Sequence, residues 1–196
     1  MIGLLGRLDV TPSLKDAYIV YKVLNDIMID YDMEVIGIMP NSLDKVSKII
    51  DMCDGIILSG GSNELNADYE IIKYIYDNNI PCLGICMGMQ EMAMLYGGVM
   101  KDTQNHHSNN NYAHKVIINN SRIYDDSIIN VNSRHKSCII KTDLEITGKS
   151  EDGIIEMVED KKKKFFVGVE WHPENMYEFD SNAKKLFDKF IESTKN

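Results

Sequence analysis

A cysteine between two glycines, and a histidine two residues before a glutamate, have the types and spacing for nucleophilic catalysis. Cys86 ends an apolar run, 80–85, and a helix-like segment from Met87 to Leu95 follows at once. A strand-to-helix turn of this kind, a nucleophile elbow, needs small neighbours so that the middle side chain can project. The N–H groups of a helix N-terminus and a nearby imidazole favour the thiolate over the thiol. We therefore predict that Cys86 is a nucleophile.

A second segment, 170–174, supplies the partners that a thiol nucleophile requires. His172 would take the thiol proton and later protonate a leaving amine, and Glu174 would hold the imidazole ring in one tautomer. Cys86, His172 and Glu174 together predict a catalytic triad. The alternatives are a buried structural cysteine and a surface loop with an ordinary salt-bridging carboxylate.

Two glycines, Gly60 and Gly61, follow the apolar segment Gly55 to Leu58. Without a Cβ, backbone N–H groups at such positions can approach an oxyanion as it develops. The pair therefore predicts an oxyanion-binding loop, and a plain tight turn is the alternative.

Four segments, in this order along the chain, resemble the class I (triad) glutamine amidotransferases. Within that family they look most similar to the γ-glutamyl-γ-aminobutyrate hydrolase branch. The segments are Asp54-Gly55-Ile56-Ile57-Leu58-Ser59-Gly60-Gly61, Gly84-Ile85-Cys86-Met87-Gly88-Met89-Gln90, Val131-Asn132-Ser133-Arg134-His135 and Gly168-Val169-Glu170-Trp171-His172-Pro173-Glu174.

The resemblance implies further site residues. The N–H of Met87 would complete the oxyanion hole with Gly60 or Gly61. Gln90, Ser133 and His135 would contact the γ-glutamyl substrate. Where the hydrolase branch commonly has two consecutive histidines, this chain has Arg134-His135-Lys136, and a surface position for His135 is the alternative.

The implied activity is hydrolysis of γ-glutamyl amides through a γ-glutamyl thioester on Cys86, releasing glutamate and an amine. The alternative with the same chemistry is a glutaminase subunit that delivers ammonia to a separate synthase. A third reading is a catalytically silent relative that binds a ligand or partner. Trp171 favours the hydrolase branch, because amidotransferase subunits usually have phenylalanine there. The short segment 62–68 indicates a pocket that is more open, or one completed by a partner chain.

Composition limits the other classes of function. At 196 residues, the chain fits one domain, 1–196, with a sizeable core. A net charge of −9 disfavours a nucleic-acid partner, and no apolar run has the length of a membrane span. Four cysteines without a disulfide or metal pattern favour a cytoplasmic protein. We expect no cofactor and no metal, with His106 and His107 in a solvated loop; a homodimer is left open.

The order of apolar and amphipathic segments predicts an α/β fold. Strand–helix alternation in the first half implies a mostly parallel central sheet with helices on both faces, as in the flavodoxin-like fold of the family. Short strands in the second half indicate antiparallel additions. Predicted strands are 2–6, 35–39, 55–58, 81–85, 115–119, 128–131, 138–141, 145–149, 154–159 and 165–170; predicted helices are 14–29, 42–52, 66–76, 87–95 and 183–191.

Overall fold

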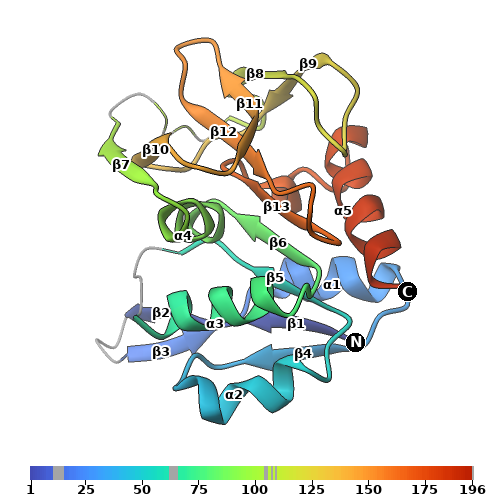
Figure 1. Ribbon diagram of the computed structural model, residues 1–196. Helices are drawn as coiled ribbons and strands as arrows, with labels where there is room; N and C mark the ends of the chain where they lie inside the picture. Colours follow the sequence, from blue (N-terminus) through green and yellow to red (C-terminus); the bar gives the residue numbers. More distant parts are fainter. Residues whose placement is uncertain (11–15, 62–65, 104–105, 107, 109, 196) are drawn as a thin grey trace.

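A long mixed sheet, flanked by helices, forms the body of the molecule in a computed structural model (Figure 1). The structure describes residues 1–10, 16–61, 66–103, 106, 108 and 110–195. The parallel part of the sheet has the order β4-β1-β5-β6-β13, and the antiparallel strands β12, β11, β8 and β9 continue from β13. This arrangement confirms the predicted fold class.

The strands of the parallel part are short and apolar. They are β1 (Ile2–Leu5), β4 (Val35–Ile38), β5 (Gly55–Leu58), β6 (Cys82–Ile85) and β13 (Phe166–Val169). All residues of β1, β5, β6 and β13 are buried, as expected for central strands covered on both faces.

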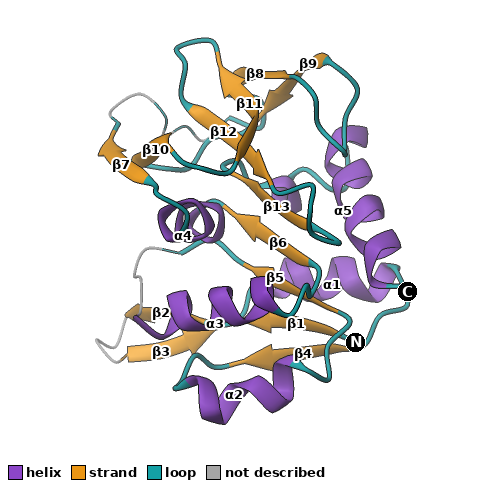
Figure 2. Cartoon of the chain, in the orientation of Figure 1, coloured by secondary structure: helices purple, strands orange, loops and turns teal. Residues whose placement is uncertain are grey.

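Among the described residues, five α-helices cover the sheet: α1 (Lys22–Asp30), α2 (Leu43–Ile50), α3 (Asn66–Asp77), α4 (Met87–Leu95) and α5 (Ser181–Thr194) (Figure 2). Alternate strand residues point to opposite faces, so the sheet has two cores. Apolar residues of α1 and α5 pack in one core with Leu4 and Leu83. Apolar residues of α2, α3 and α4 pack in the other with Leu5 and Cys82.

The second half adds antiparallel strands, which Figure 1 shows beyond β13. They are β8 (His114–Ile118), β9 (Ser127–Val131), β11 (Glu145–Ser150) and β12 (Ile155–Glu159). β10 (Ser137–Lys141) pairs with β12 and with β7 (Val99–Asp102), a strand that sequence patterning missed. The sequence predicted the antiparallel pairing correctly, but β13 is parallel to β6.

The predicted helix 14–29 is wrong over residues 16–21, and residues 14 and 15 lie outside the described residues. A hairpin of β2 (Arg7–Val10) and β3 (Asp16–Ile19) precedes α1, which begins only at Lys22. Exposure alternates along β3, and the β-branched and aromatic residues that follow Ala17 favour an extended backbone. The apolar residues of an alternating strand and of the helix that follows it therefore happen to match helical spacing across residues 16–29.

In the part of the chain that the structure describes, no helix has the length and apolar character needed to cross a membrane. All four cysteines are free thiols and are buried.

Candidate active site

Three neighbouring parallel strands bring the predicted triad and the glycine pair to one edge of the sheet. Gly84 of β6 is in register with Leu58 of β5 and with Gly168 of β13. The segments that follow these strands therefore leave the sheet side by side at its carboxyl edge, where ligands bind in open α/β sheets. The segment after β5 contains Gly60 and Gly61, the segment after β6 begins with Cys86, and the segment after β13 contains His172.

The backbone at Cys86 is strained. Its φ of 51° and ψ of −109° lie in a region that residues other than glycine rarely adopt. Its N–H donates to the Val169 oxygen at 2.8 Å, and α4 begins at the next residue. This geometry is that of a nucleophile elbow.

The glycines around Cys86 are required by packing. A Cβ at Gly88 would lie 2.2 Å from the Leu58 backbone oxygen, and one at Gly84 would lie 2.4 Å from Met92 Sδ. Helix α4 can therefore press against β5 and β6 only because both positions lack a side chain. The elbow is set by close helix–sheet contact as well as by the local turn.

His172 and Glu174 form a close pair beside the thiol. His172 Nδ1 lies 2.7 Å from Glu174 Oε1, and Pro173 begins the short 3₁₀ turn η1 (Pro173–Asn175) that connects them. Burial acts to lower the pKa of His172, but the Glu174 carboxylate and a hydrogen bond with Cys86 outweigh it and raise that pKa to about 10. His172 is therefore an imidazolium at neutral pH, as a thiolate–imidazolium pair requires.

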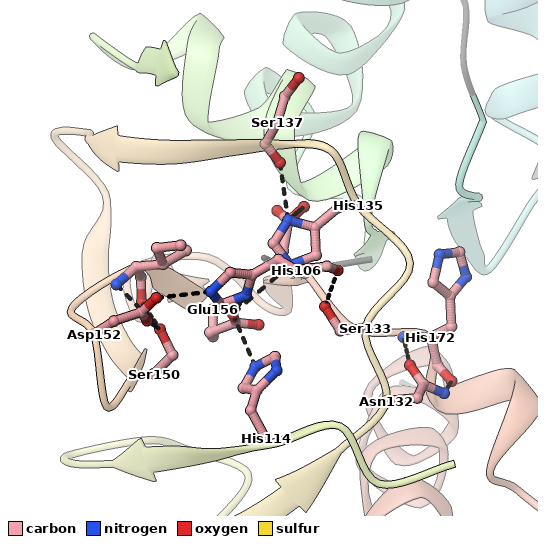
Figure 3. Close-up of polar contacts among 12 residues, drawn as sticks. His106, His114, Asn132, Ser133, His135, Ser137, Ser150, Asp152, Glu156 and His172 are labelled. Carbon is pink, nitrogen blue, oxygen red and sulfur yellow. Dashed lines mark hydrogen bonds and ion pairs between the residues drawn. The ribbon is translucent and has the colours of Figure 1, made fainter. Parts of the chain in front are cut away.

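Asn132 fixes the backbone of His172 and was not singled out from the sequence. The His172 N–H donates to Asn132 Oδ1 at 2.8 Å, and Asn132 Nδ2 donates to the His172 oxygen at 2.7 Å (Figure 3). The one sequence signal for Asn132 was that it lies in the segment 131–135, which resembles the family. Asn132 contacts His172 only through the main chain, so it positions the ring.

The glycine loop borders both reacting side chains. A Cβ at Gly60 would lie 2.8 Å from His172 Cε1 and 3.5 Å from Cys86 Cβ. A Cβ at Gly61 would lie 3.1 Å from the Met87 side chain. The N–H of Met87 lies in the first turn of α4, where N–H groups have no intrahelical acceptor. Oxyanion binding by Gly60 or Gly61 together with Met87 stays a prediction that this proximity favours.

A buried ion-pair network supports the same loop. The Arg7 guanidinium donates to the Ser59 oxygen at 2.8 Å and to both Glu91 oxygens at 2.9 and 2.7 Å, and it also pairs with Asp68 at 3.2 Å. Ser59 precedes the glycines and Glu91 belongs to α4, so Arg7 ties the oxyanion loop to the elbow helix. The sequence signal was a charged residue directly after the first apolar strand.

A cavity of about 190 Å³ opens beside Cys86. The β2–β3 hairpin and the residue Tyr21 form one wall. Its lining residues are Arg7, Leu8, Asp9, Ile19, Tyr21, Gly61, Cys86, Arg134 and His172. A larger hollow of about 710 Å³ lies at the amino ends of the strands, near Met1 and Pro81, and contains none of the triad. The smaller cavity is the candidate substrate site.

The three predicted substrate contacts, Gln90, Ser133 and His135, make hydrogen bonds within the protein. Gln90 Nε2 donates to Glu170 Oε1 at 2.5 Å and to the Ser137 oxygen at 3.1 Å. Ser133 Oγ donates to the His106 backbone oxygen. His135 is only 3% exposed, so its surface alternative is wrong. None of the three lines the cavity beside Cys86, and their contact with substrate stays a prediction.

His106 does not lie in a solvated loop as predicted. It is 6% exposed and its Nε2 lies 2.8 Å from Asp152 Oδ2. The His106 ring lies against the rings of His114 and His135, which no local pattern revealed. His107 lies outside the described residues.

The fold and this arrangement define a cysteine–histidine–carboxylate site at the carboxyl edge of an α/β sheet. A profile of the family "Glutamine amidotransferase class-I" matches residues 13–193, and the chain belongs to that family.

Three relatives illustrate its similarity to known proteins. A glutamine amidotransferase-like protein of Rickettsia prowazekii is 25% identical, over 81% of this chain and 83% of that protein. Anthranilate synthase component 2 of Cyanophora paradoxa is 31% identical, over 70% and 74%. The crystal structure of a GMP synthase-like protein from Thermoplasma acidophilum shares the fold with a TM-score of 0.76 at 22% identity, over 99% and 94%.

Proposed function

We propose that this chain hydrolyses γ-glutamyl amides in the manner of a γ-glutamyl-γ-aminobutyrate hydrolase, releasing glutamate and an amine. The observation that carries the proposal is the thiol of Cys86 at a strained elbow, hydrogen-bonded to an imidazolium that Glu174 holds. Membership of a glutamine amidotransferase family supports a γ-glutamyl amide as the substrate class.

The proposed reaction has two halves. The Cys86 thiolate attacks the γ-carbonyl carbon, and N–H groups of Met87 and the glycine loop stabilise the oxyanion. His172 gives its proton to the leaving nitrogen, and the C–N bond breaks to leave a γ-glutamyl thioester. Water, deprotonated by His172, then attacks the thioester carbonyl. The C–S bond breaks, glutamate leaves, and the thiolate–imidazolium pair is restored.

The cavity suits the amino-acid end of such a substrate. Asp9 and Arg134 both line it, with opposite charges. We propose that Arg134 binds the α-carboxylate and Asp9 the α-ammonium group, because a zwitterionic end requires one partner of each sign. The β2–β3 hairpin contributes Asp9, so this hairpin is proposed as a specificity element.

The second candidate is a glutaminase subunit that works with a separate synthase. The match to anthranilate synthase component 2 over most of both chains favours it. Trp171, which favoured the hydrolase branch, is buried in the core and does not line the cavity. It therefore carries no information about the leaving amine, and an assay must separate the two candidates.

The test is release of glutamate by the purified chain alone, from glutamine and from γ-glutamyl-γ-aminobutyrate. Cys86→Ala is the control for a contaminating enzyme. The proposal predicts Cys86-dependent turnover of the second substrate at a kcat/KM at least tenfold above that for glutamine. A preference for glutamine, or slow release that a synthase component accelerates, would favour the glutaminase subunit.

An inactive wild-type chain with either substrate would favour the third reading, a ligand-binding relative. Isothermal titration of Cys86→Ala with γ-glutamyl-γ-aminobutyrate separates this case. Binding without turnover by the wild-type chain would contradict the proposed hydrolase.

A further inference from the structure

Three histidines and one glutamate meet behind the active site, in the antiparallel half (Figure 3). His106 Nδ1, His114 Nε2 and His135 Nε2 lie 3.7, 3.0 and 3.9 Å from Glu156 Oε1. The four residues come from separate places: the segment after β7, the start of β8, the β9–β10 connection and the second position of β12. We call them the histidine cluster.

The outer nitrogens of two rings have oxygen partners that fix the tautomer. His106 Nε2 lies 2.8 Å from Asp152 Oδ2, and His135 Nδ1 donates to the Ser137 backbone oxygen at 2.9 Å. With N–H groups directed outward, the lone pairs of His106 Nδ1 and His135 Nε2 face the centre of the cluster.

This arrangement is costly without a positive charge at its centre. Glu156 is 0% exposed, and the outward N–H groups leave His106 Nδ1 and His135 Nε2 as acceptors that face its carboxylate. Apart from their contacts with Glu156, the three inward nitrogens have no hydrogen-bond partner among the described residues. Buried acceptors that face one another are destabilising. A proton on Glu156 would satisfy one nitrogen, whereas a cation would satisfy all of them.

We propose that His106, His114, His135 and Glu156 bind one divalent transition-metal ion, with Zn²⁺ the best fit. Imidazole and carboxylate ligands suit zinc, whereas calcium and magnesium prefer oxygen ligands. The ligand atoms of His106, His135 and Glu156 lie within 4.8 Å of one another. Zinc–nitrogen bonds of about 2.0–2.1 Å would draw these side chains inward by roughly 1 Å. Asp152 and Ser137 then hold the rings from outside, as carboxylates and carbonyls do in known zinc sites.

The ion would hold the segment that supports His172. Ser133 binds the His106 backbone, and its neighbour Asn132 holds the backbone of His172 on both sides. None of the four cluster residues lines the cavity beside Cys86. The ion is therefore a structural one that orders the 132–137 connection, and it takes no part in bond breaking.

The test is isothermal titration of chelator-treated Cys86→Ala protein with ZnCl₂. The substitution removes the thiolate with which His172 could bind zinc on its own. The expected result is one ion per chain with micromolar or tighter affinity. CoCl₂ titration should give visible d–d bands without a thiolate charge-transfer band, because the ligands are nitrogen and oxygen.

Two variants and a matched control assign the ligands. In the Cys86→Ala background, His135→Gln and Glu156→Gln should each weaken zinc binding more than about 100-fold, because loss of an outer partner alone costs about 10–100-fold. Glu145→Gln, at an exposed position of β11, should bind zinc as its parent does. Circular dichroism checks that each variant is folded.

Three results would overturn the proposal: no zinc binding tighter than millimolar by the parent protein, undiminished binding by both folded variants, or a cobalt–thiolate band. The first of these results is measured on the parent protein alone, so the proposal can be overturned even when neither ligand variant folds.

Discussion

The 132–135 segment connects two histidine–carboxylate sites, the active site and the histidine cluster. In each site an oxygen holds one nitrogen of a histidine ring, and the two sites differ in what the other nitrogen faces. In the active site, Glu174 holds one nitrogen of His172 and the other faces the Cys86 thiol beside a cavity. In the histidine cluster, Asp152 and a backbone oxygen hold the outer nitrogens, and the inner ones converge on a buried carboxylate.

The pKa values follow this difference. A carboxylate and a thiol raise the pKa of His172 to about 10 in spite of burial. His135 has burial as its main influence, and its pKa falls to about 4. An imidazole that stays charged can deliver protons, whereas one that stays neutral can offer a lone pair. A histidine is thus suited to proton transfer in the active site and to metal binding in the histidine cluster.

The largest effect is expected from Cys86→Ala, which should abolish hydrolysis at the active site and leave zinc binding at the histidine cluster unchanged. Cys86→Ala should lower γ-glutamyl hydrolysis on the order of 10⁴-fold or more, because it removes the atom that forms the thioester. Its midpoint of thermal unfolding and its zinc affinity should match those of the wild-type chain after the latter's thiol is blocked. Residual turnover above a hundredth of the wild-type rate would show that another group attacks the substrate.

Matching carboxylate-to-amide changes sharpen the comparison. The ordinary pKa of 6.5 is raised to about 10 in His172, so the imidazolium and its stabilising contribution are fully present below about pH 6.5 and are lost as pH rises through about 10. Glu174→Gln should lower kcat by about 10²–10⁴-fold and move the alkaline limb of the kcat/KM profile to lower pH.

Two controls accompany that profile. Glu178→Gln, at an exposed position of the same loop, should keep the wild-type limb. Glu156→Gln should also leave the limb in place, because burial, Glu174 and Cys86 are what set the pKa of His172. An unmoved limb in Glu174→Gln would remove Glu174 from its proposed role.

A smaller effect is expected at the oxyanion loop. Gly60→Ala would place a methyl group 2.8 Å from His172 Cε1, so the ring must shift. We expect kcat/KM to fall about 100-fold with zinc affinity unchanged, since misplacement by about 1 Å has that cost. Gly37→Ala, in the edge strand β4, is the matched control and should retain wild-type activity. Full activity of Gly60→Ala would exclude the close contact.

The smallest effect is expected at the outer partner of the histidine cluster. Asp152→Asn keeps a hydrogen-bond acceptor for His106 but removes the charge, so zinc affinity should fall about 10-fold. Steady-state hydrolysis at saturating zinc should stay within about twofold of wild type, because Asp152 lies outside the cavity. Isothermal titration and the glutamate assay give the two values.

The sequence was sufficient to predict the structure where the residues involved are adjacent in the chain. The elbow could be predicted with its strand and helix because the glycines, the cysteine and the following helix are adjacent in the chain. The partnership of Cys86 with His172 was inferred from the chemistry that a thiol nucleophile requires, and the structure places the two residues close together. What patterning could not show is that β13 is parallel to β6 while its neighbour β12 is antiparallel.

Structure formed by distant segments was missed. Strand β3 was taken for the first turns of a helix and β2 was not predicted, although this hairpin contributes Asp9 and Ile19 to the cavity. The histidine cluster joins residues 106, 114, 135 and 156. The sequence drew attention to His106 as part of a histidine pair and to His135 as a substrate contact, but it did not bring them together. Sequence spacing cannot report such clusters, because the pairing of β8, β11 and β12 brings them together.

The most direct test of the account is the intact mass of the protein after an acid quench during turnover of γ-glutamyl-γ-aminobutyrate. The account predicts a species heavier by one γ-glutamyl group, located on Cys86 by peptide mapping, and absent from Cys86→Ala. Glu174→Gln should change its amount without moving its position. Turnover with no adduct at early times, or an adduct on another residue, would contradict a thioester at Cys86.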